Sequence, residues 1–86
     1  MINKPTMLEH ELWREESETG IEHTFCRAGP KGDTARATLG ANAELIWTVF
    51  ASSYSRAMEK YYNFMEWGEY TVIHEADREP YSSEDE

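Results

Sequence analysis

The chain lacks the cysteines that a disulfide needs, because Cys26 is the only one among its 86 residues. A single cysteine is typical of proteins from reducing compartments. Long apolar runs are also missing, and none approaches the ~20 residues that cross a bilayer. Lys4 and Pro5 are soon followed by acidic residues rather than by the apolar region of a secretory signal. These absences predict a cytoplasmic protein without a membrane segment.

Basic residues are scarce, with 8 Lys and Arg against 17 Asp and Glu, so the net charge is −9. This sign disfavours direct binding to nucleic acid, whose phosphates repel an acidic surface. The acids are also unevenly placed. Residues 66–86 hold eight acids and one base, Arg78, and so carry −7 of the total. A local field of one sign selects partners, whereas dispersed charge mainly keeps a protein soluble.

Hydrophobic residues make up 40% of the chain and include three Trp, five Tyr and three Phe. That content is too high for a disordered chain and suits one small globular domain. We expect residues 1–75 to form this domain. Residues 76–86 are polar and acidic, and they predict a flexible tail.

Two alternating segments, residues 7–16 and 21–27, predict a β-hairpin around a turn at residues 17–20. The favoured register sets Glu16 opposite Ile21 and Leu12 opposite Phe25. It gathers four apolar side chains on one face and leaves the acids on the other, whereas a one-residue slip would mix the two. The apolar set is Leu8, Leu12, Ile21 and Phe25. The acids Glu9, Glu11 and Glu22 are then expected to form a solvated outer row.

The rest of the chain predicts one main helix and further strands. Asp33 is expected to cap a short helix over residues 34–39. Residues 43–51 are apolar on both parities, which predicts a third strand that is central or covered on both faces. A serine cap and spacing of i, i+3, i+4 and i+7 predict a helix over residues 54–67. Residues 70–73 are a candidate fourth strand.

The expected fold is therefore α+β: a small antiparallel sheet of three to four strands, the hairpin first, packed by one main helix and followed by the acidic tail. The chain resembles a group of small uncharacterised bacterial proteins. The resemblance spans about residues 8–70 and rests on LWREE (12–16), HTFCRAGP (23–30), Gly32-Asp33 with Ala35-Arg36, and YY…WGEY (61–70). It implies a bacterial or bacteriophage context and no biochemical role.

The acidic end and the aromatic residues near it predict a protein-binding surface. Carboxylates attract a basic partner, and exposed aromatic rings are common in interfaces. A nucleic-acid mimic that inhibits a nucleic-acid-binding protein is one specific version. The alternative for the tail is a purely solubilising role. The partner-binding candidates are Trp13, Tyr62, Glu66, Trp67, Glu69, Glu75, Asp77 and Glu79.

A second hypothesis places an acidic metabolite at the turn spanning residues 29–33, within residues 21–40, a stretch with a net positive charge. Glycines expose backbone N–H groups, and nearby cations would add attraction. Its candidates are Arg27, Lys31, Gly32 and Arg36. A tight turn with a capped helix is the simpler interpretation of the same residues. A homodimer built on Trp13 or Trp47 is a third alternative.

No catalytic or metal-binding pattern stands out. The register places Cys26 opposite Glu11, and a carboxylate raises the pKa of a thiol rather than activating it. The three histidines lack the spacing of a metal site. We therefore expect a non-enzymatic protein that needs no cofactor and no metal.

Overall fold

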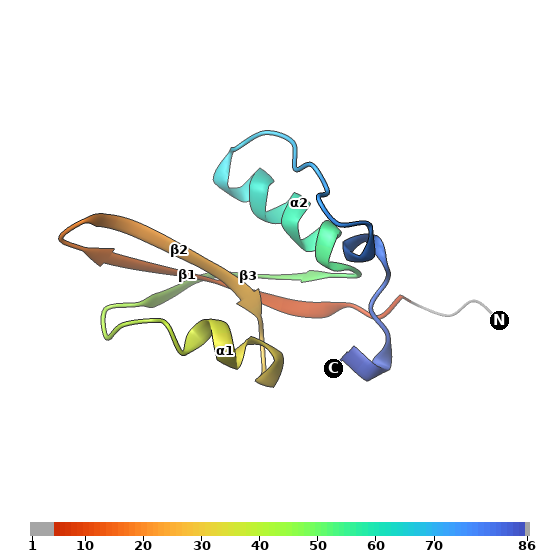
Figure 1. The fold of residues 1–86 in the computed structure, drawn as a ribbon, viewed down its shortest axis with the longest axis horizontal. Helices are drawn as coiled ribbons and strands as arrows, with labels where there is room; N and C mark the ends of the chain where they lie inside the picture. The colour runs from red at the N-terminus through yellow and green to blue at the C-terminus, as the bar shows by residue number, and fades with distance from the viewer. Residues whose placement is uncertain (1–4, 86) are drawn as a thin grey trace. The chain divides into compact units, whose positions relative to one another are not determined.

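The structure is a computed structural model that describes residues 5–85. Its regular elements follow the chain from a hairpin to a main helix (Figure 1). The expected α+β class is confirmed by a three-stranded antiparallel sheet and one main helix. The strands and α-helices are β1 (Leu8–Ser17), β2 (Gly20–Arg27), α1 (Asp33–Arg36), β3 (Glu44–Ala51) and α2 (Tyr54–Met65). The 3-10 helices are η1 (Pro30–Gly32), η2 (Glu75–Arg78) and η3 (Ser83–Asp85).

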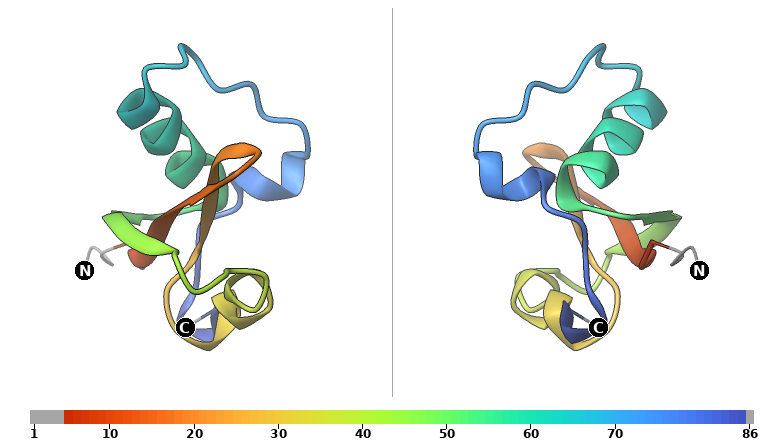
Figure 2. Two further views of the ribbon diagram at one scale, coloured as in Figure 1. Left: turned by 90° about the vertical axis from the view of Figure 1, so that its left-hand side faces the viewer. Right: turned by 90° about the vertical axis from the view of Figure 1, so that its right-hand side faces the viewer.

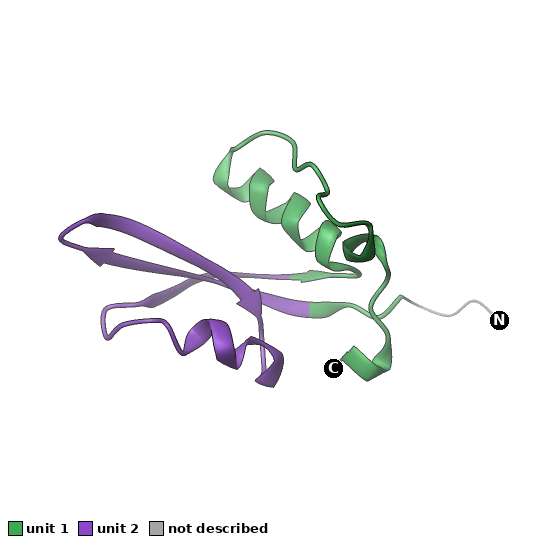
Figure 3. Ribbon diagram, viewed as in Figure 1, with its two compact units in different colours: residues 1–8, 50–86 green, residues 9–49 purple. Residues whose placement is uncertain are grey.

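The described residues divide into two compact units (Figure 3). One unit is residues 9–49, which include the hairpin, α1 and most of β3. The other contains α2 and the chain after it.

The hairpin adopts the predicted register. Glu16 pairs with Ile21, Leu12 with Phe25 and Glu11 with Cys26. Ser17 also pairs with Gly20, so two residues form the turn instead of the expected four. Gly20 has φ 134°, a backbone conformation that residues with a side chain rarely adopt. The pattern of apolar and acidic residues thus specified the pairing.

The strand order is β2-β1-β3, so β3 is an edge strand. The prediction that residues 43–51 form a central or doubly covered strand is wrong. Leu45, Ile46 and Phe50 are exposed, and Phe50 retains 53% of its accessible surface. An apolar sequence on both parities indicates a strand, but it does not report which neighbours cover it.

The inner face of the sheet holds a small core. Leu12 and His10 are fully buried. The His10 ring stacks on Phe25 with centroids 5.5 Å apart, and Phe25 lies 6.5 Å from Trp47. Ile21, which was expected on this face, is 54% exposed because it lies beside the turn. The core therefore depends on stacked rings as much as on aliphatic side chains.

The short helix differs from its prediction in cap and length. Asp33 is the first residue of α1 rather than its cap, and Gly32 precedes it without a side-chain hydrogen bond. The Asp33 carboxylate instead accepts a hydrogen bond from Arg36 at 2.6 Å. The helix spans four residues, not the predicted 34–39. A nearby guanidinium has thus recruited the carboxylate that the cap would need.

Helix α2 begins as predicted and ends two residues early. The Ser53 hydroxyl accepts a hydrogen bond from the Arg56 N–H at 3.1 Å, which is the expected N-cap. Glu66 adopts the left-handed conformation and ends the helix, ahead of the expected Gly68. Ala57 and Tyr61 of the predicted apolar stripe are buried, whereas Tyr54 and Phe64 are exposed.

After α2 the chain returns along the helix (Figures 1 and 2). We call residues 66–79 the return segment. Residues 70–73 do not form the predicted fourth strand. The segment ends where Pro80 forms a bridge with Ser53 and the Tyr81 N–H donates to the Ser52 carbonyl at 2.7 Å. The helices η2 and η3 lie in the part of the chain that overlaps the predicted tail, residues 76–86.

Candidate functional site

The return segment is attached to α2 at both of its ends. At its start, Trp67 lies edge-on to Tyr61 and Tyr62, with ring centroids 5.2 and 5.3 Å away. Tyr70 meets Tyr62 in the same manner at 5.1 Å. Edge-to-face pairs of this kind add attraction beyond the area they bury. The far end is held by the bridge to Ser53.

Three carboxylates of the return segment are exposed and form no ion pair within residues 5–85. They are Glu66, Glu69 and Glu79. Trp67, between the first two, is 52% exposed although its ring touches both tyrosines. The segment therefore presents acids and an indole to solvent on a backbone that is held at both ends.

Two other predicted acids are already engaged. Glu75 forms an ion pair with Arg78 at 3.3 Å. Asp77 is half-buried, and its negative charge helps to raise the pKa of Tyr70 and of Tyr54. For both tyrosines burial is the larger cause of the shift, because it disfavours the phenolate. Asp77 is therefore less available to a partner than Glu66, Glu69 and Glu79. Glu75 stays accessible, because its side chain is 86% exposed despite the ion pair.

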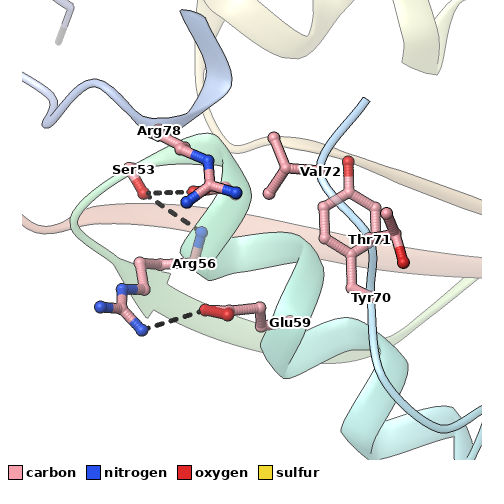
Figure 4. Close-up of a pocket in the computed structure, with 8 residues that line it drawn as sticks. Ser53, Arg56, Glu59, Tyr70, Thr71, Val72 and Arg78 are labelled. Carbon is pink, nitrogen blue, oxygen red and sulfur yellow. Dashed lines mark hydrogen bonds and ion pairs between the residues drawn. The ribbon is translucent and has the colours of Figure 1, made fainter. Parts of the chain in front are cut away.

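Two adjoining pockets lie between α2 and the return segment, and they share Glu59 and Tyr70. The first, of about 430 Å³, includes Arg56, Arg78 and Thr71 in its wall. Figure 4 shows Arg78 beside Ser53 at the start of α2, and residues 70–72 across from the helix. Arg56 forms an ion pair with Glu59 at 3.1 Å.

The second pocket, of about 360 Å³, is completed by Asn63, Gly68 and Glu69. Its wall therefore carries two carboxylates and no cation. The charged residues of the two pockets thus differ in net sign: the first has two guanidiniums and Glu59, and the second has Glu59 and Glu69.

A third pocket, of about 190 Å³, lies near the end of the chain. Its wall includes Tyr54, Asp77 and Pro80. Glu79 lines the same hollow, so two of the predicted acids, Asp77 and Glu79, lie at its wall.

The turn at residues 29–33 is a closed clamp rather than an open anion site. Arg36 donates to the Glu11 carboxylate at 3.0 Å, to the Arg27 carbonyl at 2.8 Å, and to Asp33 and the Gly29 carbonyl. The Asp33 carboxylate is the largest influence that raises the pKa of the Arg36 guanidinium. Gly32 is buried in the same clamp. Of the four ligand-binding candidates, Lys31 remains exposed.

The expected solvated row on the outer hairpin face is wrong for Glu11. Its side chain is only 18% exposed and is held by Arg36 and by the Trp13 N–H, which donates at 3.1 Å. Cys26 lies opposite Glu11 and is buried. Burial raises the pKa of the Cys26 thiol, Glu11 raises it further, and Arg36 partly offsets the shift. The thiol is therefore a poor nucleophile.

The structure brings most, but not all, of the predicted partner-binding residues together. Tyr62 is half-buried in the ring cluster, and Trp13 belongs to the other unit. Sequence reasoning missed the paired pockets, and with them Arg56, Glu59 and Arg78. The cap at Ser53 does signal that Arg56 lies in the first turn of α2. Nothing in an irregular segment signals that residues 70–72 run beside that helix.

The chain matches no protein-family model, no curated protein and no solved structure. None of the helices in residues 5–85 has the length and apolar character to cross a membrane. Over the same residues, no three side chains of His, Cys, Asp or Glu are grouped as metal ligands.

Proposed function

We propose that this protein is a non-enzymatic protein-binding module that contacts a basic partner through the return segment. The observation that carries the proposal is the exposure of Glu66, Glu69 and Glu79 on a segment held at both ends. Acids fixed on a scaffold attract a basic surface at a smaller entropic cost than acids on a free tail. Exposed Trp67 adds an aromatic anchor of the kind that interfaces favour.

A more specific form of the proposal is a nucleic-acid mimic. Fixed carboxylates can occupy a site that normally binds phosphates, because both present negative charge to lysine and arginine side chains. The partner would then be a nucleic-acid-binding protein, inhibited by occupation of its basic site. A bacterial or bacteriophage cytoplasm suits this role.

The acidic-metabolite hypothesis has less support. Arg36 is engaged by two carboxylates and two carbonyls, so an anion would have to displace these interactions. Lys31 is exposed, but its ammonium is a compact point charge that does not fix a ligand's orientation. Arg27, the other cation beside the turn, is half-buried. The clamp is better explained as a device that joins α1 to the hairpin.

The test is affinity capture from a lysate of the source organism with the full chain and a triple variant. The variant replaces three exposed glutamates of the return segment: Glu66→Gln, Glu69→Gln and Glu79→Gln. Glutamine keeps the shape of the side chain and removes the charge. Point changes are preferable to truncation, because Pro80 and Tyr81 hold the return segment in place.

A matched control replaces three exposed glutamates of the other unit: Glu18→Gln, Glu22→Gln and Glu44→Gln. Both variants change the net charge by the same amount. We expect the full chain and the control to retain a basic protein that the return-segment variant loses. Equal capture by all three proteins would refute the proposed surface and leave the acidic end a solubilising role.

A further inference from the structure

The two pockets beside α2 adjoin each other, because both are lined by Glu59 and Tyr70, and we call the two together the groove. Its two ends differ in charge. Arg56 and Arg78 mark the basic end, and Glu69 marks the acidic end. The two guanidiniums beside the carboxylates repel a partner that carries only positive charge, so they favour a partner with charges of both signs.

We infer that this groove binds a bipolar peptide segment, with a cationic side chain at the Glu69 end and a carboxylate at the Arg78 end. The inference rests on the proposed function and deepens it, since it specifies the chemistry of the partner. A guanidinium binds a carboxylate through two parallel hydrogen bonds, which fixes orientation as well as affinity. Tyr70 supplies an aromatic wall at the junction.

The length of the groove sets the spacing of the two charges. From Arg56 to Asn63 the helix rises ~10 Å, at ~1.5 Å per residue. A polyproline II segment advances ~3.1 Å per residue and has three residues per turn. Residues at i and i+3 of such a segment therefore lie on one side, ~9 Å apart, which is close to the rise of α2 between Arg56 and Asn63.

The charges of Arg56 and Arg78 are available at modest cost. Their ion pairs with Glu59 and Glu75 connect residues three apart, and both arginine side chains are more than half exposed. Exposed pairs of this kind contribute little to stability. A ligand carboxylate can therefore replace or join them without disrupting the fold.

The test uses four acetylated, amidated peptides and the ¹⁵N-labelled full chain. Two peptides are bipolar, Lys-Pro-Pro-Glu and Glu-Pro-Pro-Lys, and cover both directions of binding. Two are like-charged, Lys-Pro-Pro-Lys and Glu-Pro-Pro-Glu. We expect one bipolar peptide to shift the amide signals of α2 and residues 68–72 and to bind more tightly than both like-charged peptides.

Charge-reversal variants then test each end. We expect Arg78→Glu and Glu69→Lys each to weaken the bipolar peptide by about three- to tenfold, the scale of one exposed ion pair replaced by a repulsion. Arg14→Glu, which makes the same charge change in the other unit, is expected to leave the affinity unaltered. Arg56→Glu serves as a second basic-end variant if Arg78→Glu alters the reference spectrum.

One result separates the groove from a simple acidic surface. If Lys-Pro-Pro-Lys binds tightest and Arg78→Glu strengthens it, the bipolar groove is refuted while the proposed acidic interface stands. If no peptide shifts the amides of the groove, the inference is also overturned, and the capture experiment still decides the proposed function by itself.

Discussion

Gly32 packs closely against the backbone of Arg27. Adding a single methyl group at this position should therefore destabilise the fold. A Cβ at this position would collide with the carbonyl of Arg27 and with the Arg36 guanidinium. The backbone cannot yield without disturbing the hydrogen bonds around Arg36. The clamp therefore needs a glycine for close approach rather than for an unusual backbone angle.

We expect Gly32→Ala to lower the free energy of unfolding by about 1–3 kcal/mol, the cost of overpacking. Urea denaturation of the full chain measures the change. Gly40→Ala is the control, because the Cβ there would meet only the end of the flexible Glu15 side chain. Equal losses in the two variants would contradict the clamp.

The contacts of Glu11 and Cys26 show which features of single residues the sequence could not predict. The hairpin register placed Glu11 opposite Cys26 correctly. It could not show that Arg36, 25 residues away, would cover that pair. Spacing within a strand predicts which face a side chain takes, but its partners from distant segments depend on the tertiary fold.

At the scale of elements, α2 depends on its N-cap. Ser53 is buried and accepts from the Arg56 N–H, and its hydroxyl also pairs with that of Ser55 at 3.2 Å. We expect Ser53→Ala to lower the free energy of unfolding by ~1 kcal/mol. Ser52→Ala is the control and should change stability by less than ~0.5 kcal/mol. If the two substitutions prove equivalent by urea denaturation, Ser53 is not the cap.

Strand order gives a second prediction at this scale. β1 is paired on both sides, whereas β3 has one free edge over the described residues. Native-state hydrogen exchange should therefore show consecutive slow amides in β1 and alternating slow and fast amides in β3. Uniformly slow exchange in β3 would place it inside the sheet, as the apolar sequence alone suggested.

The elements that the sequence predicted well are those with strong periodicity and caps. The hairpin and the start of α2 are examples, because alternation and a serine cap each report a local geometry. The position of β3 was missed because its apolar pattern does not specify neighbours. The return segment was missed because ring contacts such as Tyr62 with Trp67 hold it in place without regular secondary structure.

For the whole molecule, the ionisation of one thiol and three phenols predicts that stability depends on pH in the alkaline range. Folding raises the pKa of the Cys26 thiol and of the phenols of Tyr54, Tyr61 and Tyr70, in each case mainly through burial. A group whose pKa is raised holds its proton more tightly in the folded chain. Its contribution to stability is complete below its ordinary pKa and is lost as the pH rises above that value.

We therefore expect the free energy of unfolding to fall as the pH passes about 8.5, where the cysteine of the unfolded chain is half ionised, and more steeply near pH 10. Urea denaturation across this range measures the decline. In Cys26→Ala the decline should begin later, in the tyrosine range. Stability that rises between about pH 8.5 and 10.5 would contradict the assigned shifts.

The sequence showed where along the chain the charges of the whole molecule lie. It did not show where the acidic side chains lie in space. The excess of acids over residues 66–86 follows from counting. Counting cannot separate Glu69, which is exposed, from Asp77, which is half-buried. Only the path of the chain along α2 shows which carboxylates a partner can reach.

The most direct test of the acidic interface is the salt dependence of partner binding. The affinity of the captured partner would be measured by calorimetry at about 50 and about 500 mM salt, for the full chain and the two triple glutamine variants. We predict a clear loss of affinity with salt for the full chain and the Glu18, Glu22 and Glu44 control. The Glu66, Glu69 and Glu79 variant should bind more weakly and depend less on salt. An affinity that is the same at both salt concentrations would contradict electrostatic recognition by the return segment.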